Sequence, residues 1–303
     1  MFRVPGLNQP TRVLQRDDQR DEELHICWTL SVVSLWDAPV RDVRSVAADE
    51  RRRLLAFLEG LTSGQWVAPS AAPGWTVQDL ALHLVDDDMS WLSHRRDGST
   101  AGRLDMSDRD RFVELLAAKN QRWVEAGRLL SRRVVVDLLA WTGDQVDALH
   151  AGCDLRGDGW VSWASSEAVP FWFNMAQEFT ERWVHQQQMR EAVGQVDDHA
   201  DHLPEVLRTF MWALPHQLGP PADAATVLEV TVVGVARWTL TPNGVDEWAM
   251  AERAATDPTA TVVLSPDAAW RSFTGATVPP DQVVVTGPRD LTDAVMRVRA
   301  IIV

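Results

Sequence analysis

The chain has 303 residues, of which 46% are hydrophobic, and its 29 basic and 43 acidic residues give a formal net charge of −14 at pH 7. Its length predicts two domains more readily than one. The negative charge opposes a broad phosphate-binding surface, so we expect no nucleic-acid partner. No apolar run reaches the roughly 20 residues of a bilayer span, which predicts no membrane partner. The two cysteines, Cys27 and Cys153, are far apart and form no CxxC motif, so we expect a reducing, cytoplasmic location.

The first 44 residues show no sustained helical or strand period, and we treat residues 1–44 as an N-terminal extension of unknown role. Residues 46–60 then follow a helical pattern that ends at Gly60. A second helix is predicted to begin after Thr76, because Asp79, three residues later, can complete a capping box with it. His83 flanks the apolar positions of that helix. A single histidine there is more often a hydrogen-bonded core residue than a metal ligand.

Helical patterns at residues 111–130 and 134–149 precede the most informative stretch, residues 170–194. Proline at its start and glycine at its end predict a helix over this range. Beside its apolar positions the helix carries a polar stripe that consists of Glu178, Glu181, His185 and Gln188. Glu181 and His185 lie one turn apart and could hold one divalent cation, although such a pair is more often only solvated or hydrogen-bonded. With His83 they form the two-histidine, one-carboxylate set of a catalytic zinc that keeps an open position.

Four main helices with short connections predict an up-and-down bundle over residues 45–214. Three tryptophans that precede the polar stripe, Trp160, Trp163 and Trp172, are expected to be core residues. The composition changes after a proline-rich hinge at 214–223. Beyond it we predict strands at 227–232, 235–240 and 259–264, and helices at 265–275 and 288–301. Residues 222–303 are therefore predicted to form a small α+β domain, and the fold class of the chain is α+β with two domains.

Residues 73–84 (PGWTVQDLALHL) and 178–194 (EFTERWVHQQQMREAVG) resemble the two signature segments of the mycothiol-dependent maleylpyruvate isomerase family. The resemblance covers about residues 46–303, and it implies a DinB-like metal-binding four-helix bundle followed by a sterol-carrier-like C-terminal domain. It implies that His83, Glu181 and His185 match the family's ligands for Zn²⁺ or another divalent metal. It also implies that the thiol cosubstrate is mycothiol, a sugar-linked cysteine conjugate of actinobacteria. A chain rich in arginine but with a single lysine agrees with such a host.

The hypothesis that follows is an enzyme in which metal-bound mycothiol is held as a thiolate that attacks an electrophilic small molecule. Transfer of the thiol to the substrate is placed ahead of cis–trans isomerisation of the maleylpyruvate type, although the sequence does not choose between them. Glu178 is the candidate proton carrier, or a group that orients a ligand histidine. Arg271 is the candidate for the arginine that can face the metal cleft in this family. A surface position on its helix is an equally good interpretation of Arg271.

Two other functional classes remain open. In a thiol-independent metal hydrolase the open position of the metal would hold hydroxide. In a non-enzymatic ligand-binding protein the metal would be structural, and a fourth protein ligand such as His150 or Cys153 would then be expected. The sequence is compatible with a monomer or a homodimer.

Overall fold

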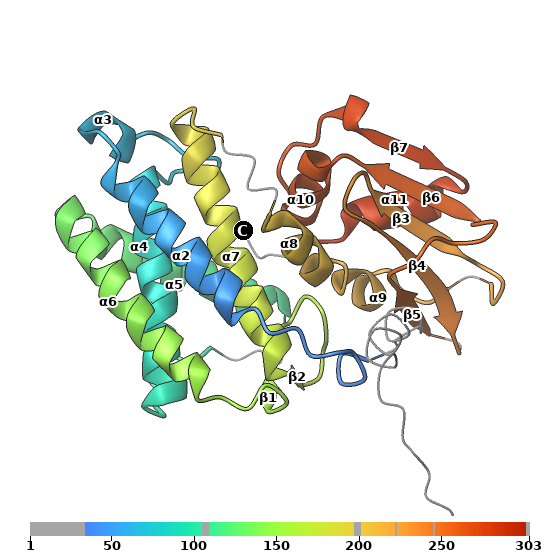
Figure 1. Cartoon of the computed structure of the whole chain (residues 1–303), viewed down its shortest axis with the longest axis horizontal. Coiled ribbons are helices and arrows are strands. Elements are labelled where there is room, and N and C mark those ends of the chain that lie inside the picture. The colour runs from blue at the N-terminus through green and yellow to red at the C-terminus, as the bar shows by residue number, and fades with distance from the viewer. Residues whose placement is uncertain (1–33, 105–108, 197–200, 222, 245, 301–303) are drawn as a thin grey trace, which may run out of the picture.

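The computed structural model describes residues 34–104, 109–196, 201–221, 223–244 and 246–300. It consists of a helical N-terminal part and a C-terminal part built on one mixed sheet (Figure 1). The predicted α+β two-domain fold class is therefore confirmed. Residues 1–33, which make up most of the N-terminal extension, lie outside the described residues.

The predicted helices of the N-terminal part are all present, with bounds close to those expected. The elements are α2 (Arg44–Glu59), α3 (Ser63–Trp66), α4 (Val77–Trp91), η1 (Leu92–Arg96), α5 (Arg109–Gly127), α6 (Arg132–Ala151), β1 (Asp158–Gly159), β2 (Val169–Pro170) and α7 (Phe171–Ala192). The predicted capping box at the start of α4 is formed: the Thr76 side chain accepts a hydrogen bond from Asp79 N, and the Asp79 carboxylate accepts one from Thr76 N. Helices α2, α4, α6 and α7 pack around one another, whereas α5 packs chiefly against α4.

The C-terminal part contains α8 (Leu203–Phe210), α9 (Ala213–Gln217), β3 (Leu228–Val232), β4 (Ala236–Asn243), β5 (Glu247–Ala251), β6 (Ala260–Leu264), α10 (Pro266–Thr274), η2 (Pro280–Gln282), β7 (Val283–Thr286) and α11 (Arg289–Arg297). The strand order is β5-β4-β3-β6-β7, with β3 and β6 parallel and the other pairs antiparallel. The predicted hinge differs, because its first residues belong to α9. Pro215 is tolerated there in the first helical turn, where no intrahelical donor is lost.

Helix α7 is buried around most of its circumference and belongs to both parts of the protein. Its aromatic residues, among them Phe173 and Phe179, join one hydrophobic core with α8, the sheet and α10. Met189, near its other end, joins a second core with α2, α4 and α6. The polar residues of α7 therefore have fixed surroundings, because the helix cannot rotate without exposing one of the two cores.

Within the described ranges, no helix has the length and apolar character needed to cross a bilayer.

A buried ionic cluster joins the four helices that pack around one another. The Asp88 carboxylate on α4, only 1% exposed, accepts hydrogen bonds from Arg51 Nη1 on α2 (2.8 Å), Arg182 Nη2 on α7 (2.7 Å) and Thr142 Oγ1 on α6 (2.8 Å). Burial by itself would raise the pKa of Asp88, but the two guanidinium groups hold it below its usual value. The carboxylate is thus ionised and fully engaged, and it fixes the positions of the helices relative to one another.

A second buried contact ties α2 to the start of α8. His202 Nδ1 lies 2.7 Å from Glu50 Oε2, and its Nε2 lies 3.1 Å from Asp49 Oδ2. The hydrogen bond with Glu50 raises the pKa of His202 above its usual value of 6.5. The folded protein therefore holds the imidazolium more tightly than the unfolded chain does, and this stabilisation is complete below about pH 6.5 and is lost as the pH rises through the raised pKa.

We expect His202→Gln to lower the free energy of unfolding by about 1–3 kcal/mol at pH 5.5, because a charge-assisted hydrogen bond is removed. At pH 9 the loss should be smaller, since the wild-type imidazole is then neutral. Urea denaturation at the two pH values measures both quantities, with the wild type measured under the same conditions as the reference. An equal or larger loss at pH 9 would contradict the assigned role of the imidazolium.

Candidate metal centre

The structure brings the three predicted ligands together. His83 projects from α4, and Glu181 and His185 project from α7; one potential ligand atom of each lies within 4.8 Å of the others. His185 Nε2 is 3.5 Å from Glu181 Oε2, and the imidazole rings of His83 and His185 meet edge to face with centroids 4.8 Å apart. Ligand atoms around one tetrahedral zinc ion are separated by about 3.4 Å, given metal–ligand distances near 2.1 Å. The three side chains therefore need only small movements to hold one ion.

The hydrogen-bonding state of both imidazoles suits metal binding. His185 Nδ1 lies 2.8 Å from Gln188 Oε1, so the ring donates its proton there and keeps the Nε2 lone pair on the side of Glu181. His83 Nδ1 is buried and has no hydrogen-bond partner among the described residues. Burial, and then the neighbouring His185, hold the pKa of His83 well below its usual value. His83 can thus offer a nitrogen lone pair from a neutral imidazole, and the hydrogen bond with Gln188 leaves His185 Nε2 as the atom that faces Glu181.

Carboxylates crowd around this centre without enough positive charge. Burial raises the pKa of Asp87 well above its usual value, and Glu178 and Glu181 raise it further. Burial likewise raises the pKa of Glu178 to about 7. A hydrogen bond from Trp91 acts to lower this pKa, and the neighbouring Glu181 acts to raise it. The only lysine, Lys119, pairs with Asp86 at 2.6 Å instead. A divalent cation would supply the missing charge, so the set of residues fits the metal that the sequence implies.

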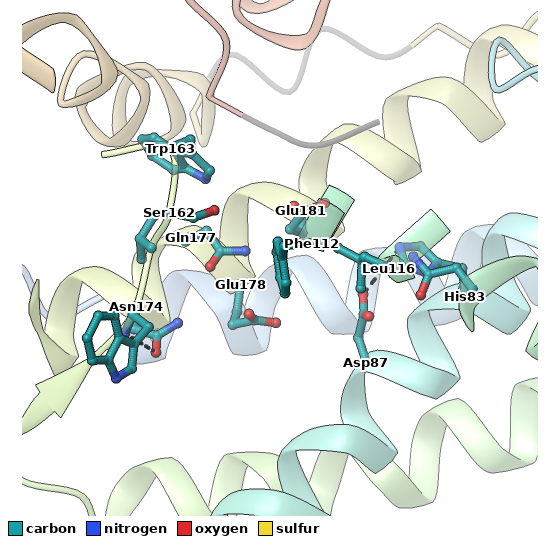
Figure 2. A pocket seen from close by; sticks show the side chains of 13 residues that line it. His83, Asp87, Phe112, Leu116, Ser162, Trp163, Asn174, Gln177, Glu178 and Glu181 are labelled. Atoms are coloured by element: carbon teal, nitrogen blue, oxygen red, sulfur yellow. Dashed lines mark hydrogen bonds and ion pairs between the residues drawn. The ribbon is translucent and has the colours of Figure 1, made fainter. Parts of the chain in front are cut away.

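Two cavities open on the three ligands. The first, which we call the polar cavity, has a volume of about 230 Å³ (Figure 2). Its lining includes His83, Asp87, Glu181 and Glu178 together with Asn174, Gln177, Ser162 and Trp160. The second, which we call the apolar cavity, measures about 200 Å³ and lies against His83 and His185. It is lined further by Ala72, Pro73, Trp75, Val113, Leu116, Ala117, Asn120 and Gln121. Because α5 contributes to both linings, its packing on α4 shapes the space beside the metal centre.

The candidate proton carrier and the candidate arginine lie in different places. Glu178 lines the polar cavity, one turn before Glu181. Arg271, on α10, pairs with Glu191 and with Asp267 Oδ2 at 2.8 Å, and it lines neither cavity. Glu191 is six residues beyond His185, about 9 Å along the helix axis. The contacts of Arg271 are thus those of a residue that ties α10 to the end of α7.

Two residues that could have supplied a fourth ligand lie elsewhere. The His150 ring packs edge to face on Trp91 and Phe171, with centroids 5.2 and 5.9 Å away, and burial lowers its pKa to about 4. Cys153 Sγ donates a hydrogen bond to Leu149 O at 3.3 Å. Within the described ranges, the group of converging ligand atoms consists of His83, Glu181 and His185.

The site also contains residues that the sequence analysis did not select. Asp87 lies one turn after His83, so helical spacing could have identified it, and its Oδ2 is 3.4 Å from His83 Nε2. Asn120 lines both cavities, but its contribution depends on how α5 packs, which no local pattern reveals. Trp163 and Trp172 are core residues as predicted, whereas Trp160 is 51% exposed and lines the polar cavity.

We expect the purified protein to bind about one zinc ion per chain and to lose it in His83→Ala and in His185→Ala. Gln188→Ala should weaken zinc binding about 10- to 100-fold, because the His185 ring is then no longer oriented. Elemental analysis and competition with a chromogenic chelator measure stoichiometry and affinity. His150→Gln and Cys153→Ser are the controls and should keep the metal. Loss of metal in a control, or retention in His83→Ala, would contradict the assignment of the three ligands.

We also expect zinc binding at pH 7 to release protons, because Glu178, whose pKa is raised by burial to about 7, is partly protonated in the metal-free protein. Glu178→Gln should reduce the number released, whereas Glu191→Gln, at the distant end of α7, should not. Calorimetric titration in two buffers that differ in ionisation enthalpy gives the proton count. An unchanged count in Glu178→Gln would show that this carboxyl group does not titrate with metal binding.

Comparison with known proteins bears on both parts of the chain. Residues 47–190 match a family model described as the mycothiol maleylpyruvate isomerase N-terminal domain. The search of curated proteins found no match. Among solved structures, the crystal structure of the mycothiol-dependent maleylpyruvate isomerase is similar, with 15% sequence identity and a TM-score of 0.51. The crystal structure of a mutant of that isomerase has 14% sequence identity and a TM-score of 0.53. Each alignment covers 84% of this chain and 96% of the other.

At these sequence identities the structural likeness shows a shared fold, and the family model adds that the helical part has the matching sequence pattern. Residues 47–190 thus match the mycothiol maleylpyruvate isomerase N-terminal domain family, and the aligned 84% of the chain has the fold of the mycothiol-dependent maleylpyruvate isomerase.

Proposed function

We propose that the protein is a metal-dependent enzyme that uses mycothiol to attack an electrophilic small molecule, with thiol transfer to the substrate as its reaction. The observation that carries the proposal is the convergence of His83, Glu181 and His185 between two cavities. A divalent ion such as Zn²⁺, when bound there, would lower the pKa of a coordinated thiol so that the sulfur is a thiolate at neutral pH. The family that residues 47–190 match supports mycothiol as that thiol.

The number of ligands favours an enzyme over a binding protein. A structural zinc site normally has four protein ligands, whereas a catalytic site has three and leaves a position open. Three converging groups are found in the described part of the chain, and the two alternatives for a fourth, His150 and Cys153, are engaged elsewhere. The open position would be reached from the polar cavity, which His83 and Glu181 line.

The polar cavity suits a sugar-linked thiol. Hydroxyl groups can donate to the carboxylates and the Gln177 amide, while the half-exposed Trp160 ring offers a flat face for the C–H groups of a sugar. The Asn174 side chain accepts a hydrogen bond from Trp160 N at 3.2 Å and so holds this loop against α7. We therefore assign the thiol to the polar cavity.

Glu178 is proposed to carry the proton of the thiol. With a pKa of about 7 it exchanges a proton readily near neutral pH, and it faces the polar cavity in which the thiol is placed. Arg271 is proposed to act only through the position of α7, since its guanidinium group is paired with Glu191 and Asp267.

A second candidate is cis–trans isomerisation by the same thiol, and the family match and the fold of the mycothiol-dependent maleylpyruvate isomerase favour it. Both reactions begin with attack of the sulfur on an electron-poor carbon. They differ in the product, because isomerisation expels the thiol again and transfer retains it.

Mass spectrometry of the products formed by the zinc-loaded protein with mycothiol and an electrophile distinguishes these reactions. We expect an S-conjugate that requires the thiol. A geometric isomer without sulfur would establish the isomerase instead, and turnover without any thiol would establish a hydrolase.

The role of Glu178 makes a separate prediction. Glu178→Gln should lower kcat/KM about 100-fold or more, because a general base is lost. In the wild type kcat/KM should rise with pH as Glu178 loses its proton, at or below pH 7, since a bound cation lowers its pKa; the variant should lack this rise. Steady-state kinetics between pH 5 and 8 test this. Glu191→Gln serves as the control and should keep the wild-type profile.

A further inference from the structure

We infer that the apolar cavity is the subsite for the electrophile, and that it selects small uncharged aromatic or otherwise apolar electrophiles over carboxylates. The inference rests on the proposed function, since it names the substrate class of that same site. It gives the two cavities different tasks: the thiol enters from the side of Glu181, and the electrophile enters from the side of His185.

The walls of the apolar cavity have no charged group. Of the described residues that line it, none is Lys, Arg, Asp or Glu. Lys119, which precedes Asn120 of the lining, donates to Asp86 Oδ2 (2.6 Å) and to Ser90 Oγ (3.2 Å). A carboxylate bound here would lose its hydration without gaining a counter-charge from the wall. The charge of a divalent ion, when bound by the three ligands, would already be matched by the Glu181 carboxylate and the mycothiol thiolate, so carboxylate binding is disfavoured.

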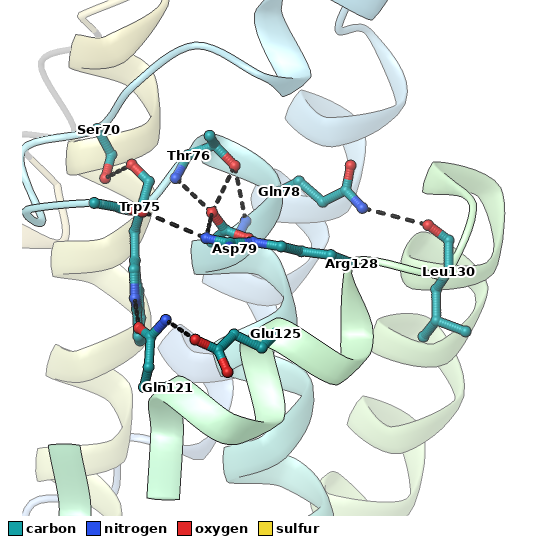
Figure 3. Close-up of polar contacts among 10 residues, drawn as sticks. Ser70, Trp75, Thr76, Gln78, Asp79, Gln121, Glu125, Arg128 and Leu130 are labelled. Carbon is teal, nitrogen blue, oxygen red and sulfur yellow. Dashed lines mark hydrogen bonds and ion pairs between the residues drawn. The ribbon is translucent and has the colours of Figure 1, made fainter. Parts of the chain in front are cut away.

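The polar atoms of the cavity wall are mostly satisfied within the wall itself. Trp75 Nε1 donates to Gln121 Oε1 at 2.9 Å, and Gln121 Nε2 donates in turn to Glu125 Oε1 at 2.8 Å (Figure 3). The indole ring of Trp75 packs against His83, with centroids 5.5 Å apart. Trp75 is thus held in place and offers an apolar face next to a metal ligand, which suits a flat apolar molecule.

The same figure shows that the nearby arginine is engaged. Arg128 donates to both oxygens of Asp79, each at 2.9 Å, and so belongs to the capping structure at the start of α4 (Figure 3). Besides His83 Nδ1, Asn120 Oδ1 is buried and has no hydrogen-bond partner among the described residues, and Asn120 lines both cavities. A single amide beside an apolar wall can orient a neutral polar substituent but cannot neutralise a carboxylate.

The reaction on such a substrate is a displacement. With an aryl chloride, the thiolate sulfur forms a C–S bond to the carbon that carries chlorine. The C–Cl bond breaks and chloride leaves with the bonding electron pair. The proton of the thiol passes to Glu178 and then to solvent.

Binding can be tested apart from turnover with two unreactive compounds that differ by one charge, 1,3-dinitrobenzene and 3,5-dinitrobenzoate. In calorimetric titrations of the zinc-loaded enzyme saturated with mycothiol, whose sulfur then occupies the open metal position, we expect the neutral compound to bind at least about tenfold more tightly. Ala117→Trp should fill the apolar cavity and weaken this binding at least about tenfold. Ala118→Trp is the matched control, because residue 118 is also exposed on α5 but lines neither cavity. Val113→Arg should reverse the preference, since it adds a cation to the wall.

Turnover is then measured with mycothiol and two reactive probes, 1-chloro-2,4-dinitrobenzene and 4-chloro-3,5-dinitrobenzoate, each as a ratio to its uncatalysed rate. We expect the larger ratio for the neutral probe. Ala117→Trp should lower this ratio to that of the anionic probe, whereas Ala118→Trp should leave it unchanged. If the neutral compound binds selectively, Ala117→Trp abolishes this binding, and no thiol-dependent turnover is found, the subsite is supported and the proposed function is refuted. If thiol-dependent turnover is found but prefers the anionic probe, or is unchanged in Ala117→Trp, the subsite is overturned and the proposed function is retained. Equal binding of the two unreactive compounds, or no binding of either, would also overturn it.

Discussion

The buried carboxylate of Asp88 fixes the relative position of the helices on which the candidate site depends. It is bonded to α2, α6 and α7 at once through Arg51, Thr142 and Arg182. Removing one partner of such a pair leaves an uncompensated buried charge and costs about 3–5 kcal/mol, so the helices cannot slide past one another without a large penalty. Asp88 lies five residues after His83, and Arg182 directly follows Glu181. The contact that holds the helices together therefore also sets His83 opposite Glu181 and His185.

Helix α7 adds a second constraint, because it serves two cores. Its aromatic residues pack with the C-terminal part, and Met189 packs with the helical part. The polar stripe between these contacts cannot reach bulk solvent freely, and this explains why the pKa of Glu178 is raised. Cavities on either side of His83 leave space for two small molecules beside one rigid set of side chains. Rigid positioning of this kind is what a reaction between two bound molecules requires.

Much of this arrangement could be predicted from local sequence patterns, and the remainder could not. The capping box at Thr76 and the bounds of α7 follow from neighbouring residues, and so does the pairing of Glu181 with His185. That α5 packs chiefly against α4 was not predicted, because an amphipathic pattern shows which face is apolar but not which helix covers it. The strand β5, with the sequence EWAMA, lacks the β-branched residues that indicate strands. The contacts of Arg271 depend on how the two parts pack, and its proposed place in the metal cleft finds no support in its ion pairs.

The central claim is that His83, Glu181 and His185 hold one metal ion with a position open to a cavity. Anomalous diffraction at the zinc edge, from crystals of the zinc-loaded protein, tests it most directly. The account predicts one strong peak about 2.0–2.2 Å from one atom of each of the three side chains, with the remaining position facing the polar cavity. A peak bound by a fourth protein ligand, or none between α4 and α7, would contradict the account.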